Sequence, residues 1–343
     1  MNKHAQRTPA PAGVDVSQRT LDVAVRDQCG NERTAQFDNT ATGHHQLIGW
    51  LTKGGKAARV VLEATGVYSL DLALALHAAK RIEVMVVNPR AARQFAQACL
   101  QRSSTDATMA VALREYAARM KFVPWVPPPE SVCHLRAIAR RIATLTKGRA
   151  SEQNRAHAAA ASAATPAVVV NDIAVNLRHL QRRLGELHRQ AMALIENDPA
   201  LTEAYHRLIS IRGIAATSAI QLLGELLVLP ADMTVRQWVA HSGLDVRHLT
   251  SGTSVHKAPR ISKQGNAHLR RALYMPALVA AQHEPHVRAF YEQLLAAGKK
   301  PLQALVAVMR KLLHAIYGML KTNTDFDGAK FRRLPQTAVA QGV

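Results

Sequence analysis

The chain has 343 residues, of which 48% are hydrophobic and only 4% aromatic, and its formal net charge is +20. This composition can bury a core of Ala, Leu, Val and Ile, which excludes a disordered chain, and the length indicates two domains. The excess of Lys and Arg predicts a polyanionic partner, with nucleic acid ahead of an anionic membrane; a basic protein without such a partner is the alternative.

The cysteines and the N-terminus predict a cytoplasmic protein. Cys29, Cys99 and Cys133 form no CxxC pair, which argues against a disulfide framework and against a zinc site. The first 13 residues are polar and lack the apolar stretch of a secretory signal. No segment reaches the roughly 18 consecutive apolar residues of a membrane span, so no membrane partner is expected.

The N-terminal third predicts a sheet with helices. Residues 13–25 hold two Val-rich runs around a polar turn, 57–63 and 82–87 are short apolar runs, and 70–76 has helical spacing. Strand, helix and strand in this order are typical of an α/β domain. A helical pattern also covers about 107–120. The prolines from Pro124 to Pro129 then exclude a continuous helix and indicate a domain boundary.

Beyond these prolines the pattern is helical. Apolar residues recur at helical spacing over 135–145 and over 173–187, on either side of an Ala-rich segment. We expect two long helices in an antiparallel, coiled-coil-like hairpin, with ordinary core helices as the alternative. From residue 201 the chain is mainly helical. Gly213 lies in a turn that resembles a helix-hairpin-helix, whose amides can hold a phosphate, and the apolar stripe over 305–316 is expected to be core.

Acidic residues follow or interrupt apolar strands at positions where burial would be costly. Asp15 lies between Val14 and Val16, Glu63 closes an apolar strand, and Asp106 begins a helix after an acid-free run. Carboxylates gathered at one edge of a sheet would suit Mg²⁺ and the metal-assisted cleavage of a phosphodiester. Each acid alone could instead be a solvated strand end or a helix cap, and capping is a specific rival for Asp106.

The segment 246–283 contains no Asp or Glu, and it joins cations to loops rich in Ser and Gly at 251–254 and 261–266. Such loops can approach a phosphate backbone closely. A serine in them can attack phosphorus if its hydroxyl is activated. On these residues alone, serines that only hydrogen-bond phosphates are the favoured interpretation.

Short motifs in a fixed order over residues 12–322 resemble the DEDD-type transposases of the insertion-sequence-110 family, which are bridge-RNA-guided serine recombinases. They are G-V-D-V-S at 13–17, L-D-V-A-V at 21–25, L-E-A-T-G-V-Y at 62–68, V-V-N-P at 86–89, R-Q-F-A at 93–96, T-D at 105–106, I-R-G-I at 211–214, S-G-L at 242–244, S-G at 251–252 and R-I-S-K-Q-G-N at 260–266. The resemblance implies an α/β ribonuclease-H-like (RuvC-like) N-terminal domain, a helical coiled-coil hairpin and a mainly α C-terminal transposase domain.

The resemblance also gives domain boundaries. We expect a disordered tail at 1–12, the RuvC-like domain at 13–125, the helical hairpin at 126–200, the transposase domain at 201–325 and a second tail at 326–343.

The resemblance assigns the family's metal-binding acids to this sequence. The first three fall on Asp15, Glu63 and Asp106, which would hold Mg²⁺. The fourth falls on Met109, and a thioether is a poor ligand for Mg²⁺. Asp22 lies on the second strand of the N-terminal hairpin and is not expected to replace the missing acid.

The family's catalytic serine falls on Ser251, with Ser254 as the local rival. Ser251 would attack a DNA phosphodiester and form a phosphoserine link, assisted by the metal. The implied partners are double-stranded DNA of the element ends and target, a noncoding guide RNA that selects sequence by base pairing, and further copies of the chain in a dimer or tetramer. The protein would act on the bacterial nucleoid. The expected nucleic-acid contacts are Arg212, Lys257, Arg260, Lys263, Arg270 and Arg271.

Other functions stay open at this point. Met109 motivates a catalytically impaired nucleic-acid-binding relic. A metal-dependent junction nuclease would use Ser251 only to contact phosphate. A sugar-kinase-like ATPase also begins with an Asp-bearing hairpin, although this chain has no glycine-rich phosphate loop.

Overall fold

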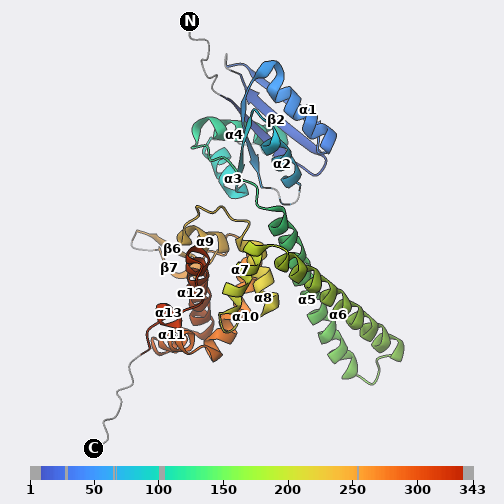
Figure 1. Ribbon diagram of the computed structural model, residues 1–343, viewed down its shortest axis with the longest axis vertical. Helices are drawn as coiled ribbons and strands as arrows, with labels where there is room; N and C mark the ends of the chain where they lie inside the picture. Colours follow the sequence, from blue (N-terminus) through green and yellow to red (C-terminus); the bar gives the residue numbers. More distant parts are fainter. Residues whose placement is uncertain are drawn as a thin grey trace, which may run out of the picture. The chain divides into compact units, whose positions relative to one another are not determined.

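The computed structural model describes residues 9–27, 30–64, 66, 68–99, 105–252 and 255–334. The chain divides into two compact units, Met1–Pro127 and Pro128–Val343. Figure 1 shows both units and labels their helices.

Unit 1 is built on a five-stranded sheet in the order β3-β2-β1-β4-β5. Its strands are β1 (Ala10–Val16), β2 (Thr20–Arg26), β3 (Glu32–Asp38), β4 (Ala58–Glu63) and β5 (Ile82–Val87). β1, β2 and β3 pair antiparallel, whereas β4 runs parallel to β1 and β5 parallel to β4. The strands expected at 13–25, 57–63 and 82–87 are confirmed. β3 was not expected, because its polar side chains alternate with half-buried ones and leave no apolar run.

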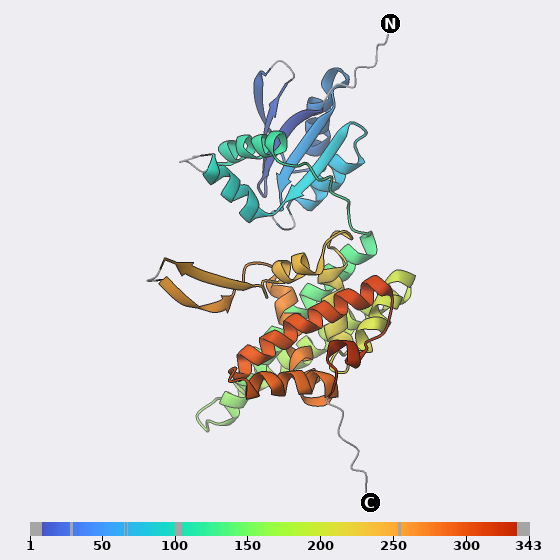
Figure 2. The ribbon, with the colours of Figure 1, turned by 90° about the vertical axis from the view of Figure 1, so that its left-hand side faces the viewer.

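Helices cover both faces of this sheet (Figure 2). They are α1 (Ala41–Thr52), the short 3₁₀ turn η1 (Lys53–Gly55), α2 (Leu70–Ala78), α3 (Pro89–Ala98) and α4 (Asp106–Arg119). Neighbouring residues of a strand point to opposite faces, so Val60 packs in the cluster under α1 and α2. Val61 packs in the cluster under α3 and α4. The expected helices at 70–76 and 107–120 are confirmed by α2 and α4.

Gly13 lets α4 lie directly against β1. A Cβ atom at this position would overlap the Ala110 carbonyl oxygen and the Arg114 amide nitrogen, and it would lie 2.7 Å from the carbonyl carbon of Leu113. These are backbone atoms of one helix and cannot rotate aside, so a larger residue would push α4 off the sheet.

We therefore expect Gly13→Ala to lower the free energy of unfolding by about 3 kcal/mol, as overpacking against fixed backbone does. Urea denaturation measures the change. Gly49→Ala in α1 is the matched control, because nothing lies within 4 Å of its added Cβ. Alanine there should be neutral or stabilise the helix. Equal losses in the two variants would contradict this account of Gly13.

A network of ion pairs around the buried Arg114 also holds α4 on the sheet. Arg114 is only 3% exposed and contacts Glu32 of β3 at 2.8 Å and Glu115 at 2.6 Å. Arg26 of β2 contacts the same two carboxylates at 2.8 Å and 2.6 Å. The helix that begins at Asp106 is therefore tied to β2 and β3 in addition to its packing on β1.

Unit 2 is mainly helical. Its elements are α5 (Glu130–Ala160), α6 (Ala167–Glu196), α7 (Pro199–Ile209), α8 (Ala216–Leu226), α9 (Val235–Ser242), β6 (Val246–Ser251), β7 (Val255–Ile261), α10 (Ala267–His283), α11 (Pro285–Ala296), α12 (Pro301–Thr322) and α13 (Gly328–Phe331). The long helices α5 and α6 pack side by side as a hairpin (Figure 1). The stripe expected at 305–316 is confirmed as core, because Leu305, Val308, Leu312 and Ile316 are buried in α12.

Two features of unit 2 differ from the expectation of a mainly helical chain with a tail after residue 325. β6 and β7 form an antiparallel ribbon that projects from the helices (Figure 2), and strand pairing was not visible in its polar sequence. The chain also stays packed beyond residue 325, because Phe331 is buried against Phe290 and Phe326. At the start of the described chain, β1 begins at Ala10, so residues 10–12 are strand and not part of the expected N-terminal tail. Within the described ranges no helix is long and apolar enough to span a membrane.

Candidate active site

The structure brings the three predicted acids together around Asp15. Asp15 follows Gly13 by two positions on β1 and so lies on the face that α4 covers. Glu63 ends β4, the parallel neighbour of β1, and is 6% exposed. Asp106 is the first residue of α4. The carboxyl end of β1, the end of β4 and the start of α4 therefore meet at one edge of the sheet.

The electrostatics of Asp15 show how close these charges are. Burial first, and then the negative charges of Asp106, Glu63 and Asp22, raise the pKa of Asp15 to about 6. Burial also raises the pKa of Glu63, and the positive charge of Arg93 partly opposes it. Carboxylates crowded at a half-buried edge repel each other unless a cation lies between them.

Asp106 is not the N-cap of α4, so the helix-capping alternative for this residue is wrong. Thr105 is the N-cap of α4, and its hydroxyl accepts a hydrogen bond from the Thr108 amide at 3.3 Å. The Thr108 hydroxyl in turn accepts from the Thr105 amide at 2.9 Å. Asp106 is exposed in the first helical turn and is not needed as the cap, so its carboxylate can face the other acids.

Asp22 is the acid that the sequence did not assign to this group. It is the direct antiparallel partner of Asp15, and directly opposed residues of two paired strands point to the same face. Its carboxylate accepts two hydrogen bonds from the Gln36 side-chain amide, at 3.1 Å and 3.2 Å. Asp15 lies two residues before Ser17, and Asp22 lies two residues after Thr20. This equal spacing from the turn was the sequence signal that could have paired the two acids.

Met109 lies where the family's fourth acid is expected. It is half-buried and packs on the apolar cluster that contains Val61, Val87 and Leu113. Its thioether therefore joins the core below α4 and supplies no oxygen.

The acidic edge has the oxygen donors that a hard cation prefers, but among the described residues it does not have a complete set of ligands around one point. Oxygen atoms of carboxylates are the ligands that Mg²⁺ prefers, and the raised pKa of Asp15 indicates negative charge in need of neutralisation. No group of three acidic, histidine or cysteine side chains in the described parts of the chain is arranged as a ready metal site. The chemistry of the donor set fits Mg²⁺.

Ser251 is the last residue of β6, near the end of the projecting ribbon, where its backbone pairs with Val255 of β7. The side chains of Ser251 and Lys257, and the whole of Ser254, lie outside the described residues. The acids belong to unit 1 and the ribbon to unit 2.

The predicted nucleic-acid contacts are mostly exposed cations of unit 2. Arg260 is paired across the ribbon with Arg247, and both are exposed, as are Lys263 and Arg271. Arg270 differs, because its guanidinium donates a 2.8 Å hydrogen bond to the Ser242 carbonyl and so also supports the fold.

Arg212 is exposed in the turn between α7 and α8. The neighbouring Gly213 has a φ of 121°, and a Cβ atom there would lie 2.9 Å from backbone atoms of Pro276 and Ala280 in α10. Packing of the turn on α10 thus explains the glycine without a phosphate ligand.

An acidic sheet edge in one unit and a cationic, serine-bearing ribbon in the other are features of proteins that process nucleic acid. Comparison with known proteins agrees. Residues 12–163 match the DEDD-type IS110 transposase model, described as a transposase, and residues 205–292 match the transposase IS116/IS110/IS902 family. This chain belongs to the IS110 family of transposases, a class of enzymes that cut and rejoin DNA.

Its relatives include proteins of similar length. The pilin gene-inverting protein of Moraxella bovis is 27% identical over 321 residues, which cover 92% of this chain and 97% of that protein. The pilin gene-inverting protein of Moraxella lacunata is 27% identical over 325 residues, with the same coverage of both chains. An insertion element IS110 uncharacterized 43.6 kDa protein of Streptomyces coelicolor is 28% identical over 162 residues, 47% of this chain and 38% of that protein.

Proposed function

We propose that this protein is the recombinase of an insertion sequence, which cuts DNA and rejoins it through a covalent phosphoserine at Ser251. The observation that carries the proposal is the set of carboxylates around Asp15, whose charges and burial raise its pKa to about 6. The sheet order, with three antiparallel strands followed by two parallel ones, supports a ribonuclease-H-like, RuvC-like unit. The pilin gene-inverting relatives support recombination as the outcome.

Asp15, Glu63 and Asp106 are the residues that would hold Mg²⁺, with Asp22 beside them. A bound divalent cation would supply Lewis-acid polarisation of a phosphate oxygen. Asp15 must be ionised to bind a cation, which its pKa of about 6 permits at neutral pH. Glu63 is the most buried of the acids, and its position at the end of β4 fixes one side of the group.

In the proposed chemistry the Ser251 oxygen forms a bond to phosphorus while the bond from phosphorus to one deoxyribose oxygen breaks. The serine proton leaves, and the departing deoxyribose oxygen takes up a proton. A hydroxyl of a second DNA strand then attacks the phosphoserine and releases Ser251. One phosphodiester replaces another, so strand exchange needs no energy-rich cofactor. The exposed cations Arg260, Lys263 and Arg271 would hold the phosphate backbone beside the ribbon.

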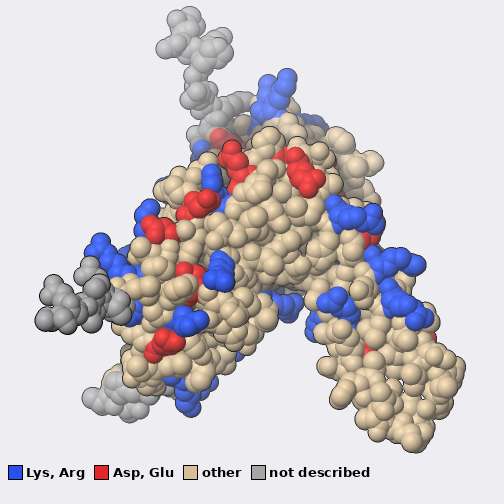
Figure 3. Space-filling model, turned by 60° about the horizontal axis from the view of Figure 1, so that its bottom comes forward, with Lys and Arg blue, Asp and Glu red and all other residues tan. Residues whose placement is uncertain are grey.

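A guide RNA and a dimer or tetramer complete the proposal, as the family resemblance implies. The net charge of +20 supports binding of more than one nucleic acid. On the face shown in Figure 3, lysine and arginine side chains lie along the part of the α5–α6 hairpin nearest the other helices, whereas the tip shows few charged side chains. Base pairing would choose the sequence while the protein holds backbone and shape.

A recombination assay tests this function. Purified protein is incubated with a plasmid carrying the element ends and a target, Mg²⁺, and RNA transcribed from the noncoding flank of the gene. We expect new DNA junctions that depend on both RNA and Mg²⁺. Junctions that form equally well without the RNA would remove the guide from the proposal, and a complete absence of junctions would favour the second candidate.

The second candidate is a catalytically impaired nucleic-acid-binding relic, favoured by the packing of the half-buried Met109 against the apolar cluster below α4. Met109→Asp restores the family's fourth acid. If the wild type is inactive for lack of this ligand, the variant gains recombination; if the three acids suffice, its rate rises by less than about ten-fold. Met109→Leu is the control for changes in packing.

The charge argument predicts a steep salt dependence of nucleic-acid affinity. With about six phosphate contacts, the logarithm of the binding constant should fall with the logarithm of salt concentration with a slope of about −5. Arg260→Gln should flatten the slope by about one. The control is Arg59→Gln, because Arg59 pairs with Glu83 at 2.6 Å on the sheet of unit 1. Binding that is unaffected by salt would contradict the proposed backbone contacts.

A further inference from the structure

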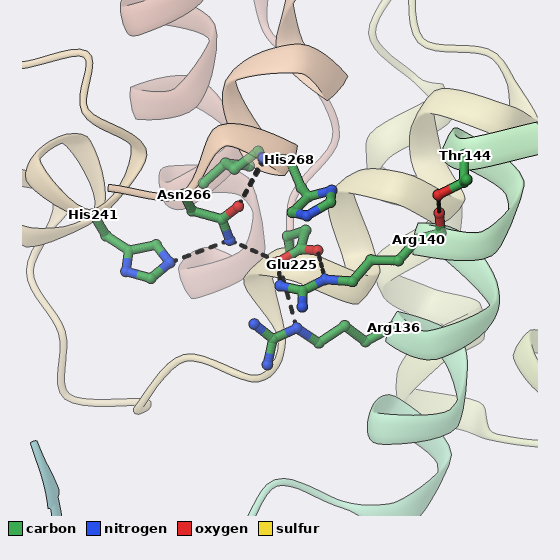
Figure 4. Close-up of polar contacts among 8 residues, drawn as sticks. Arg136, Arg140, Thr144, Glu225, His241, Asn266 and His268 are labelled. Atoms are coloured by element: carbon green, nitrogen blue, oxygen red, sulfur yellow. Dashed lines mark hydrogen bonds and ion pairs between the residues drawn. The ribbon is translucent and has the colours of Figure 1, made fainter. Parts of the chain in front are cut away.

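Glu225 of α8 is a buried carboxylate that joins three parts of unit 2 (Figure 4). It is 2% exposed. Arg140 of α5 donates to its Oε1 at 2.6 Å and to its Oε2 at 3.0 Å. The Asn266 side-chain amide donates to Oε2 at 2.6 Å, and Arg136 of α5 lies 3.4 Å from the same oxygen.

These contacts keep Glu225 charged. Burial opposes its ionisation, but the hydrogen bonds from Arg140 and Asn266 and the charges of both arginines outweigh burial and hold the pKa of Glu225 below its ordinary value. A buried ion pair of this kind adds little stability over well-packed apolar residues, so its use in a core suggests a role in fixing geometry.

Asn266 connects Glu225 to the segment that follows the ribbon. Its Oδ1 caps α10 by accepting from the His268 and Leu269 amides at 2.9 Å and 3.1 Å. Its backbone amide donates to the His241 carbonyl of α9 at 2.6 Å. Asn266 therefore joins α8, α9 and α10 at the end of the motif 260–266.

The base of the ribbon is anchored on the same segment. The Ser262 amide donates to the Asp245 carbonyl at 2.8 Å, and the Lys263 amide donates to the Gly243 carbonyl at 3.1 Å. Lys263 has a left-handed φ of 53°. The ribbon that carries Ser251 is therefore closed at its base by the hydrogen bond between Lys263 and Gly243. Lys263 lies three residues before Asn266, and Gly243 lies two residues after His241.

We infer that Glu225 is a positioning residue for Ser251: through Asn266 it fixes the base of the β6–β7 ribbon to α8 and to the α5 end of the helical hairpin. The inference rests on the proposed role of Ser251 as nucleophile. Glu225 lies in the helical core and the nucleophile near the end of a projecting ribbon, so it acts through the backbone and not on the substrate. A ribbon attached at a changed angle would hold the serine away from phosphorus, and small displacements of that kind cost large factors in rate.

Asn266→Asp tests the link without removing the helix cap. Aspartate caps a helix as well as asparagine does. Its side chain cannot donate to Glu225, and it brings a second carboxylate to Oε2. We expect the rate of covalent protein–DNA adduct formation to fall on the order of 10- to 100-fold. Nucleic-acid affinity should change little, whereas the melting temperature should fall because two carboxylates then face each other at a buried position.

Glu225→Gln places an amide against the Asn266 amide and should lower the adduct rate in the same way. The double variant Glu225→Gln with Asn266→Asp exchanges amide and carboxylate, so that the side chain at position 225 becomes the donor and the side chain at position 266 the acceptor. We expect it to recover much of the rate that each single variant loses. Glu152→Gln is the matched control, because Glu152 is also a buried acid paired with an arginine, Arg155, at 2.5 Å on α5.

Hydrogen exchange provides a readout that does not depend on catalysis. In Asn266→Asp the amides of Ser262 and Lys263 should exchange faster, and in the double variant they should return toward the wild-type rate. Unchanged exchange, or adduct rates that follow melting temperature without recovery in the double variant, would overturn the inference. A wild type that forms no adduct would instead refute Ser251 as nucleophile, while the exchange data still decide whether Glu225 fixes the ribbon.

Discussion

Ser251→Ala should abolish covalent attachment of the protein to DNA and reduce recombination by about 1,000-fold or more, because no other group at that position can take over nucleophilic attack. The measurement is a denaturing gel of protein trapped on a labelled DNA in which the departing strand is too short to remain paired. Nucleic-acid affinity should stay within about three-fold of wild type, since one hydroxyl contributes little to a contact dominated by cations.

Ser254→Ala is the matched control, since Ser254 lies three residues further along the same segment. If Ser251 is the nucleophile, Ser254→Ala keeps the adduct. If the adduct persists in Ser251→Ala and disappears in Ser254→Ala, the assignment moves to Ser254. Cleavage by Ser251→Ala at the wild-type rate, with no adduct in either protein, would identify a metal-dependent nuclease in which the serine only contacts phosphate.

Asp15→Asn should make the metal-free protein more stable and at the same time remove its Mg²⁺-dependent activity. The pKa of Asp15 is raised from 3.8 to about 6 in the folded chain. A raised pKa means that ionisation costs folding free energy: the favourable contribution is present below pH 4 and is lost as the pH rises through 6. At pH 7.5 the neutral asparagine avoids that loss, which we put at about 2 kcal/mol after allowing for partial exposure of the site.

Urea denaturation at pH 4 and at pH 7.5 measures this effect. Wild type and Asp15→Asn should differ little at pH 4 and most at pH 7.5. Adding Mg²⁺ at pH 7.5 should raise the melting temperature of the wild type and leave that of the variant almost unchanged. Glu83→Gln, which breaks only an exposed pair with Arg59, serves as the control and should respond to Mg²⁺ as the wild type does.

Equal stability of wild type and Asp15→Asn at both pH values would contradict the crowding of carboxylates around Asp15. A stability gain without any Mg²⁺ response would keep the crowding and reject the metal. The stability difference therefore tests the crowding of carboxylates, and the response to Mg²⁺ tests the metal site independently.

The sequence was sufficient for features that depend on neighbouring residues. The Val-rich runs of β1, β2 and β4 and the apolar stripe of α12 follow from the period of each element, because burial selects side chains along one face. Asp15 and Glu63 could be named because each occupies an unfavourable place within or at the end of an apolar strand, and Asp106 because it begins a helix after a long run without acids. The ordered motifs indicated the family, which the comparisons confirm.

Only the tertiary structure decided which distant residues meet. Asp22 joins Asp15 through strand register, and Glu225 meets Asn266 across 41 residues and Arg140 across 85. Glu225 and Asn266 interrupt no local period that would have identified them. The polar ribbon that carries Ser251 has too few apolar side chains to mark its strands. A linear pattern reports which face of an element is buried, whereas the identity of the partner depends on how whole elements pack, and that information is distributed over the entire unit.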